Sequence, residues 1–243
     1  MAWALRKLDE EQRLVGSVSV TSESRQQTSK SVELPPPPIK PDQEWANAWT
    51  HGAASAISLY LAYLLIREAS VISTGMAVAC AAYMASVFGT FFCSTLSHVV
   101  RRQPLLNTMR AWDQAMIYTM ISGTYTPIAF RYCTDETRTP LLIAIWISAG
   151  VGFFFKVCHQ HRVNSIGTVS YLLLGWLPAI PLVGQVPGVL VAWMIAGGVL
   201  YTAGVSLLVN DHRVRYLHAG WHLFVMAAAT CHFWAIWKHV VPV

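Results

Sequence analysis

The hydrophobic positions of this chain fall into seven long runs, which are separated by short breaks rich in charged residues, glycine or proline. The runs cover residues 46–66, 71–98, 112–130, 139–156, 165–183, 187–209 and 216–237. A helix needs about 20 mostly apolar residues to cross a lipid bilayer, and most of the runs are close to that length. The pattern therefore predicts an all-α integral membrane protein with seven transmembrane helices.

Charged residues are scarce, and those present are concentrated at the start of the chain. They make up 12% of the sequence, against roughly 25% in an average soluble domain. Residues 1–44 hold 13 of the 29 charged side chains, and a run of four prolines occupies positions 35–38. Such a segment cannot bury enough apolar surface to offset the entropy of ordering it. We expect a disordered cytoplasmic tail over residues 1–44 and one seven-helix domain over residues 45–243.

The distribution of basic residues predicts the orientation of the helices. With seven spans, 13 of the 17 Lys and Arg residues fall on the side of the tail and four on the other side. Short cytoplasmic loops collect Lys and Arg, so the N-terminus is predicted to be cytoplasmic and the C-terminus outside. We expect a multi-pass protein of the plasma membrane, with an internal membrane as the other possibility. No nucleic-acid-binding motif accompanies the basic residues.

A few polar residues at the ends of the spans are candidates for a functional site. The second run ends with Ser94 and His98, which share one helix face, and the seventh run begins with His218 and His222, which share another. Asp113 lies at the start of the third run, where an acid can also serve as an N-cap or a first-turn residue. Because successive spans alternate in direction, all five side chains are predicted to lie at the cytoplasmic end.

Three histidines and one carboxylate at a single depth have the composition of a metal site. A single histidine of this kind is more often an ordinary residue at the membrane interface, but a set from three helices at one level favours metal binding. Neutral imidazole is a good ligand for zinc, and three protein ligands plus one water are typical of catalytic zinc. We therefore predict a zinc ion bound by His98, His218 and His222.

A polar stripe marks the first span, where polar residues recur every three or four positions. Its members are Glu44, Asn47, His51, Ser55 and Ser58. This spacing places them on one side of the helix. The stripe either lines the predicted site or packs against a neighbouring helix through its small hydroxyl residues, and the sequence leaves both interpretations open.

The remaining histidines and cysteines do not extend the predicted site. His232 follows His218 by 14 residues, about 21 Å along a helix, so it is expected to line a cavity or to form a hydrogen bond in the core. The cluster Cys158-His159-Gln160-His161 is interpreted as a solvated loop. The five cysteines contain no CxxC pair and lie mostly in apolar runs, so no disulfide framework is expected.

Several motifs in a fixed order resemble those of one membrane-protein family. They are Glu44-x-x-Asn47-x-x-Thr50-His51-Gly52, Ser94-x3-His98, Trp112-Asp113-Gln114-Ala115, Gly123-Thr124-Tyr125-Thr126-Pro127 and His218-Ala219-x-Trp221-His222. Their combination resembles the adiponectin receptor and haemolysin III related family, also called the progestin and adipoQ receptors. The amino-acid sequence around Asp113 and His222 is similar to that of the haemolysin III and monocyte-to-macrophage differentiation factor branch.

The resemblance implies a fold, a metal site and two classes of function. It implies seven helices with the N-terminus inside, zinc bound by the three histidines, and Asp113 and Ser94 beside the water at the metal. Receptor members are linked to hydrolysis of lipid amides such as ceramide, whereas bacterial members are named for a cytolytic activity. Our leading hypothesis is a zinc-dependent hydrolase of a ceramide-like lipid, in which Asp113 accepts a proton and Ser94 stabilises the oxyanion. The alternative is a non-catalytic receptor-like or pore-forming protein with a structural zinc.

Overall fold

The computed structural model describes residues 40–159 and 165–241, and these residues form helices and no strands. The elements are α2 (Pro41–Ile72), α3 (Thr74–Val99), α4 (Leu105–Tyr132), α5 (Asp135–His159), α6 (Ser165–Trp176), the 3-10 helix η1 (Leu177–Leu182), α7 (Gly188–Val209) and α8 (Leu217–His239). Seven α-helices in this part of the chain confirm the all-α prediction.

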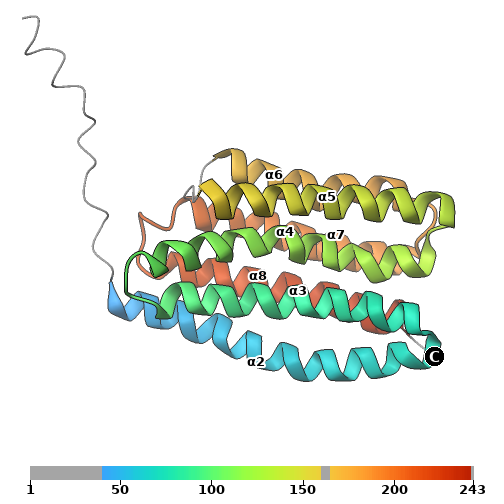
Figure 1. Ribbon diagram of the computed structural model, residues 1–243, viewed down its shortest axis with the longest axis horizontal. Coiled ribbons are helices and arrows are strands. Elements are labelled where there is room, and N and C mark those ends of the chain that lie inside the picture. The colour runs from blue at the N-terminus through green and yellow to red at the C-terminus, as the bar shows by residue number, and fades with distance from the viewer. Residues whose placement is uncertain (1–39, 160–164, 242–243) are drawn as a thin grey trace, which may run out of the picture. The chain divides into compact units, whose positions relative to one another are not determined.

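The helices lie side by side, and successive helices run in opposite directions (Figure 1). α3 packs against α2 on one side and against α4 on the other, and α4 also packs against α5. α8 packs against α7 and α2, so the first and last described helices are neighbours. This arrangement brings the end of α3 and the starts of α4 and α8 to one end of the bundle.

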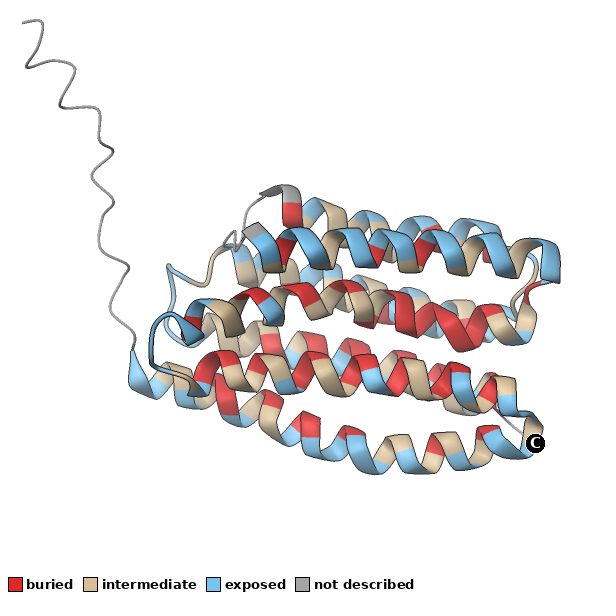
Figure 2. Ribbon diagram, viewed as in Figure 1, coloured by how far each residue is buried: buried red, intermediate tan, exposed pale blue. Residues whose placement is uncertain are grey.

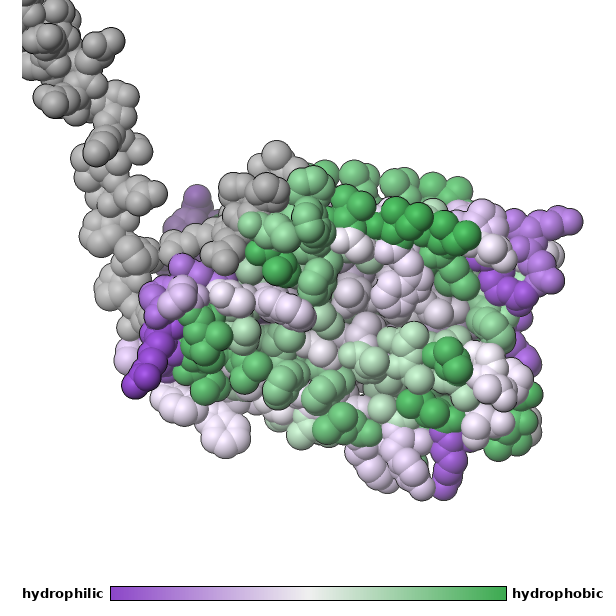
Figure 3. Space-filling view, viewed as in Figure 1, coloured by the Kyte–Doolittle hydropathy of each residue, from purple (hydrophilic) through white to green (hydrophobic). Residues whose placement is uncertain are grey.

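Five helices are long and apolar enough to span a membrane: α2, α3, α5, α7 and α8. Figure 3 shows apolar side chains over the middle of the visible face and hydrophilic ones gathered towards the ends of the helices. A belt of apolar surface between two polar ends is the arrangement that a bilayer requires. The chain is therefore a multi-pass membrane protein.

α4 is long enough to span a bilayer but is more polar than the other long helices. Its polar side chains are buried inside the protein, where Ser122 donates to the carbonyl of Ile145 and Thr126 donates to that of Ser122. Figure 2 shows buried residues along α4, whereas α5 is largely exposed on this side. α4 contacts α3, α5, α6 and α8, so its surface meets protein more than lipid.

Three differences from the predicted helix boundaries affect the interpretation. The run at 165–183 divides into α6 and η1, because Pro178 and Pro181 cannot donate the backbone hydrogen bonds of a continuous α-helix. α2 begins at Pro41, before the predicted domain boundary at residue 45, with Asp42 and Glu44 in its first turn. Proline and acidic residues both suit a helix start. The rest of the predicted tail, residues 1–39, lies outside the described residues.

The third difference concerns Asp113. α4 begins at Leu105 and not at residue 112, so Asp113 lies about two turns inside the helix. An acid at that position cannot cap the helix or interact with the backbone amides of its first turn. The interpretation of Asp113 as an N-cap or first-turn residue is therefore wrong, and its place in the protein needs another explanation.

Candidate metal centre

The three predicted histidine ligands come together at the end of the bundle where α3 ends and α8 begins. His98, His218 and His222 each offer one ligand atom, and these atoms lie within 4.8 Å of one another. His222 and His98 are buried, and His218 is partly buried. Nitrogen ligands lie about 2.0–2.1 Å from zinc, so small side-chain rotations bring all three within reach of a single ion.

Two of the histidines are oriented by carboxylates. His98 Nδ1 lies 2.6 Å from Glu44 Oε2, and His218 Nδ1 lies 2.8 Å from Asp211 Oδ2. Glu44 is also 3.5 Å from the Arg110 guanidinium. A carboxylate accepts, so in the neutral form of each imidazole Nδ1 carries the proton and Nε2 keeps its lone pair. Carboxylates behind the ligands are typical of histidine–zinc sites.

A hydroxyl orients the third histidine. Thr50 Oγ1 donates to the carbonyl of Asn47 at 2.8 Å, so its only proton is already used. The same oxygen lies 3.0 Å from His222 Nδ1 and must therefore accept from the protonated nitrogen. His222 Nε2 is then also unprotonated. All three imidazoles are held in the tautomer that a metal ligand needs.

One nitrogen of the cluster is left without a partner inside the protein. His98 Nε2 is fully buried and makes no hydrogen bond with the described residues. An unpaired buried polar group costs about 1–3 kcal/mol, and binding a cation offsets that cost. Three neutral imidazoles with oriented Nδ1–H groups are a ligand set that zinc accepts. The residues present therefore fit a zinc ion.

The hydroxyl behind His222 gives a direct test of this orientation. We expect Thr50→Val to lower zinc affinity about 10–100-fold, because valine keeps the shape of the side chain but cannot accept from Nδ1. Thr50→Ser, which keeps the hydroxyl, should retain most of the affinity. Isothermal titration with zinc measures both variants, and equal affinity in Thr50→Val and the wild type would contradict this role.

A small polar cavity of about 80 Å³ lies beside the histidines. Its lining includes His51, Ser94, Asp113, Gln114, Lys156, His218 and His222. Ser97 Oγ lies 2.9 Å from Asp113 Oδ2 and 2.8 Å from the carbonyl oxygen of Ser94, so its one proton is shared between these two acceptors. Asp113 Oδ1 and Ser94 Oγ have no hydrogen-bond partner among the described residues, so both remain available to a bound molecule. The predicted Asp113 and Ser94 thus line the same cavity as two of the three histidines.

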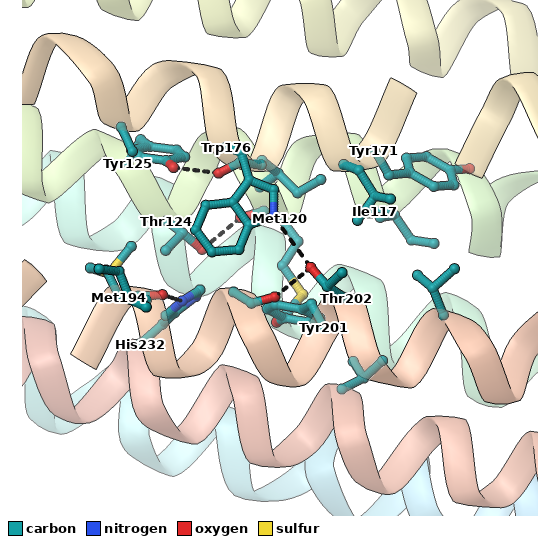
Figure 4. Close-up of a pocket in the computed structure, with 18 of the residues that line it drawn as sticks. Ile117, Met120, Thr124, Tyr125, Tyr171, Trp176, Met194, Tyr201, Thr202 and His232 are labelled. Atoms are coloured by element: carbon teal, nitrogen blue, oxygen red, sulfur yellow. Dashed lines mark hydrogen bonds between the residues drawn. The ribbon is translucent and has the colours of Figure 1, made fainter. Parts of the chain in front are cut away.

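A second, much larger cavity adjoins the polar one. It has a volume of about 380 Å³, lies among α4, α6, η1, α7 and α8, and has a mainly apolar lining (Figure 4). The two cavities share Thr90, Ile117, Thr168, Tyr171, Leu208, Trp221 and Val225. A chemically reactive set of side chains therefore borders a space suited to a hydrophobic chain.

His232 belongs to the large cavity and not to the metal cluster. Its Nε2 lies 3.2 Å from the carbonyl oxygen of Met194, and the side chain lines the apolar cavity (Figure 4). This confirms the prediction of a cavity-lining, hydrogen-bonded histidine. The Cys158–His161 cluster falls largely outside the described residues; Cys158 itself is exposed, and all five cysteines have free thiols.

The polar stripe of α2 serves both purposes that the sequence left open. The His51 ring stacks on that of His222 with centroids 3.6 Å apart, and neither of its nitrogens has a hydrogen-bond partner within the part of the chain that the structure describes. Glu44, in the first turn of α2, contacts His98 through its carboxylate. Further along α2, Ser58 is buried between the helices and donates to the carbonyl of Ser55. The start of α2 therefore lines the site, and its middle packs in the bundle.

Sequence reasoning missed several residues that support the site. Asp211 lies in the loop only seven residues before His218, which it orients, and it was not among the predicted site residues. Arg215 and Tyr216, in the loop before α8, both donate to Asp42 at the start of α2. The ion pair with Asp42 raises the pKa of the Arg215 guanidinium and ties the two helix starts together.

The fold and the site together define a class of protein. It is a helical multi-pass membrane protein with a buried histidine cluster that fits a metal ion, next to an apolar cavity. A model of the family described as Haemolysin-III related matches residues 39–233, which include the histidine cluster and Asp113. The chain belongs to this family, as the sequence motifs predicted.

Individual relatives come from bacteria and animals. Hemolysin-3 of Bacillus cereus is 32% identical over 204 residues, covering 82% of this chain and 93% of the relative. The Hemolysin-3 homolog of Bacillus subtilis strain 168 is 29% identical, covering 83% and 96%. Human monocyte to macrophage differentiation factor is 27% identical over 155 residues, covering 62% and 65%. These relatives carry the haemolysin III and monocyte-to-macrophage differentiation factor names that the motifs indicated.

Proposed function

We propose that this protein is a zinc-dependent hydrolase that cleaves a ceramide-like lipid amide at the cytoplasmic side of the membrane. The observation that carries the proposal is the junction of the two cavities. The polar cavity contains His218, His222, Asp113 and Ser94, and it shares part of its wall with the apolar cavity. A lipid amide needs both environments, one for the reacting carbonyl and one for its acyl chain.

His98, His218 and His222 would hold the zinc, since each offers one ligand nitrogen within 4.8 Å of the others and each Nδ1 atom already has a hydrogen-bond partner. When bound, zinc supplies a Lewis acid that polarises a carbonyl and lowers the pKa of water towards 7. Three protein ligands leave one position open for substrate or water, which is the arrangement of catalytic zinc sites.

Asp113 and Ser94 supply the acid–base chemistry and the oxyanion contact. Ser97 fixes Asp113 through Oδ2, so Oδ1 is free to accept a proton from the attacking water and to pass it to the leaving amine. The Ser94 hydroxyl, which has no partner among the described residues, donates to the oxygen of the carbonyl as negative charge develops there. Both side chains line the cavity that the carbonyl would enter.

The apolar cavity would hold the acyl chain. Its volume of about 380 Å³ is within the range of about 300–1,000 Å³ that small-molecule sites occupy. Its lining includes Met120, Ile128 and Leu172, which present apolar surface to such a chain. Two of the helices around the cavity, α7 and α8, are long and apolar enough to span a membrane, which places the cavity within reach of a lipid.

The side of the membrane follows from the basic residues. The metal cluster lies at the bundle end that carries Arg101, Arg102, Arg110 and Arg213, the side predicted to be cytoplasmic. The proposed substrate is therefore a lipid of the inner leaflet, in the plasma membrane or an internal one.

Hydrolysis of defined lipids tests the proposal. Full-length protein in detergent micelles is loaded with zinc and incubated with ceramides of several acyl lengths, and mass spectrometry quantifies the fatty acid and the sphingoid base. We expect both products in equal amounts, loss of their formation with a chelator, and its recovery with added zinc. Intact ceramide in the presence of fully loaded, folded protein would contradict the proposal and favour a structural metal.

A further inference from the structure

Lys156 is a buried cation in the polar cavity that the proposed hydrolysis does not use. It lies near the end of α5 and is only 6% exposed. Lysine is rarely buried to this extent without a charged partner, because desolvating the ammonium is costly. At helix ends, lysine usually extends towards water. Here the side chain instead lines the cavity next to Asp113 and the histidines.

The described residues satisfy only part of the hydrogen-bonding capacity of the ammonium. Lys156 Nζ donates to Gln114 Oε1 at 3.0 Å and lies 5.9 Å from the centre of the Tyr171 ring. An ammonium has three protons to donate. Among the described residues, no carboxylate lies within 4.0 Å of Nζ. Gln114 directly follows Asp113 on α4, so this contact holds the cation close to the proposed reaction centre.

The charges around the cavity favour an anion. Asp113 and Lys156 balance one another, and an imidazole that binds a metal is neutral. Glu44 and Asp211 lie behind the histidines and do not line the cavity. Glu44 also pairs with Arg110, so a divalent metal would leave the site with a net positive charge even when both carboxylates are counted.

We propose that Lys156 selects lipids whose headgroup carries an anionic oxygen, as a carboxylate or a phosphate, next to the scissile amide. This inference rests on the proposed function, since it names the substrate class of the same site. Lys156 is a specificity residue: its free N–H groups donate to the anionic oxygen while the acyl chain occupies the apolar cavity. A neutral headgroup would leave those donors unpaired.

Binding of uncleavable lipids tests the proposal separately from catalysis. Three probes share one acyl chain. In each probe a methylene group replaces the amide NH, so the amide becomes a ketone that cannot be hydrolysed. Their headgroups are a carboxylate, a phosphate and a neutral hydroxyl. Their dissociation constants are measured on full-length, zinc-loaded protein. We expect at least one anionic probe to bind about ten-fold or more tightly than the hydroxyl probe, and the tighter of the two identifies the headgroup.

Variants assign this preference to one side chain. Lys156→Gln should remove most of it and leave the affinity for the hydroxyl probe unchanged, and Lys156→Arg should keep it. Lys238→Gln is the matched control, because Lys238 is an exposed lysine near the opposite end of the bundle.

Two results would overturn the proposal. One is equal binding of all three probes to the wild type. The other is a preference that persists in Lys156→Gln, which would assign the anion to the metal alone. Equal weakening of all probes in Lys156→Gln would show a structural role instead, and it also counts against the proposal. A preference that depends on Lys156, in a protein that cleaves neither ceramide nor the amide that carries the preferred anionic headgroup, would refute the proposed hydrolysis and leave the lipid preference intact.

Discussion

His222→Ala should remove stoichiometric zinc from the purified protein and abolish the proposed lipid hydrolysis. His222 is the most deeply buried of the three ligands, at 1% exposed, and Thr50 holds it in the metal-binding tautomer. Alanine leaves two protein ligands, and zinc sites need at least three. The loss should exceed the 10–100-fold that is typical when only a residue behind a ligand is changed. Elemental analysis of the protein after gel filtration measures the metal content directly.

The matched control is His212→Ala. His212 is an exposed histidine in the loop before α8, so its removal should leave the metal content unchanged. Zinc should also raise the melting temperature of the wild type and of His212→Ala, but not that of His222→Ala, because a ligand stabilises the state that binds it. Equal zinc content in His222→Ala and the wild type would refute the assignment of the cluster.

Asp113→Asn should lower turnover of the lipid about 10²–10⁴-fold and leave the zinc content unchanged. The carboxylate is anchored by Ser97 through Oδ2, so asparagine can keep that contact with its carbonyl oxygen. Asparagine cannot accept a proton at neutral pH, and general acid–base catalysis contributes about this much to rates. Single-turnover measurements with a ceramide that the wild type cleaves give the effect on turnover, and elemental analysis gives the effect on zinc content.

Asp135→Asn provides the comparison for Asp113→Asn. Asp135 lies at the start of α5, at the opposite end of the bundle, and pairs with Arg138 on the surface. Its replacement should affect neither turnover nor metal content. If Asp113→Asn instead loses zinc, then Asp113 is a metal ligand and not the proton acceptor. Unchanged turnover in Asp113→Asn would exclude it from the chemistry.

The helices could be predicted from the sequence because a membrane leaves the backbone little choice. Inside a bilayer every backbone N–H and C=O must be satisfied within the segment, so an apolar run of about 20 residues forms a helix. The first and last residues of a helix were harder to predict where the helix contacts protein and not lipid. α4 extends back to Leu105 although this first turn has little apolar pattern, and this extension moved Asp113 away from the helix start.

By itself, the sequence determined which residues could meet. The alternating direction of the spans required the end of α3 and the starts of α4 and α8 to share one end, so His98, Asp113 and His218 were already matched in depth. Only the tertiary structure decided which helices are neighbours and how each is rotated about its axis. Those two choices placed Thr50 and Glu44 behind the histidines and turned Lys156 into the cavity. Which helices are neighbours and how each is rotated are set by packing between segments far apart in the chain. The local periodicity of the sequence carries no information about that packing.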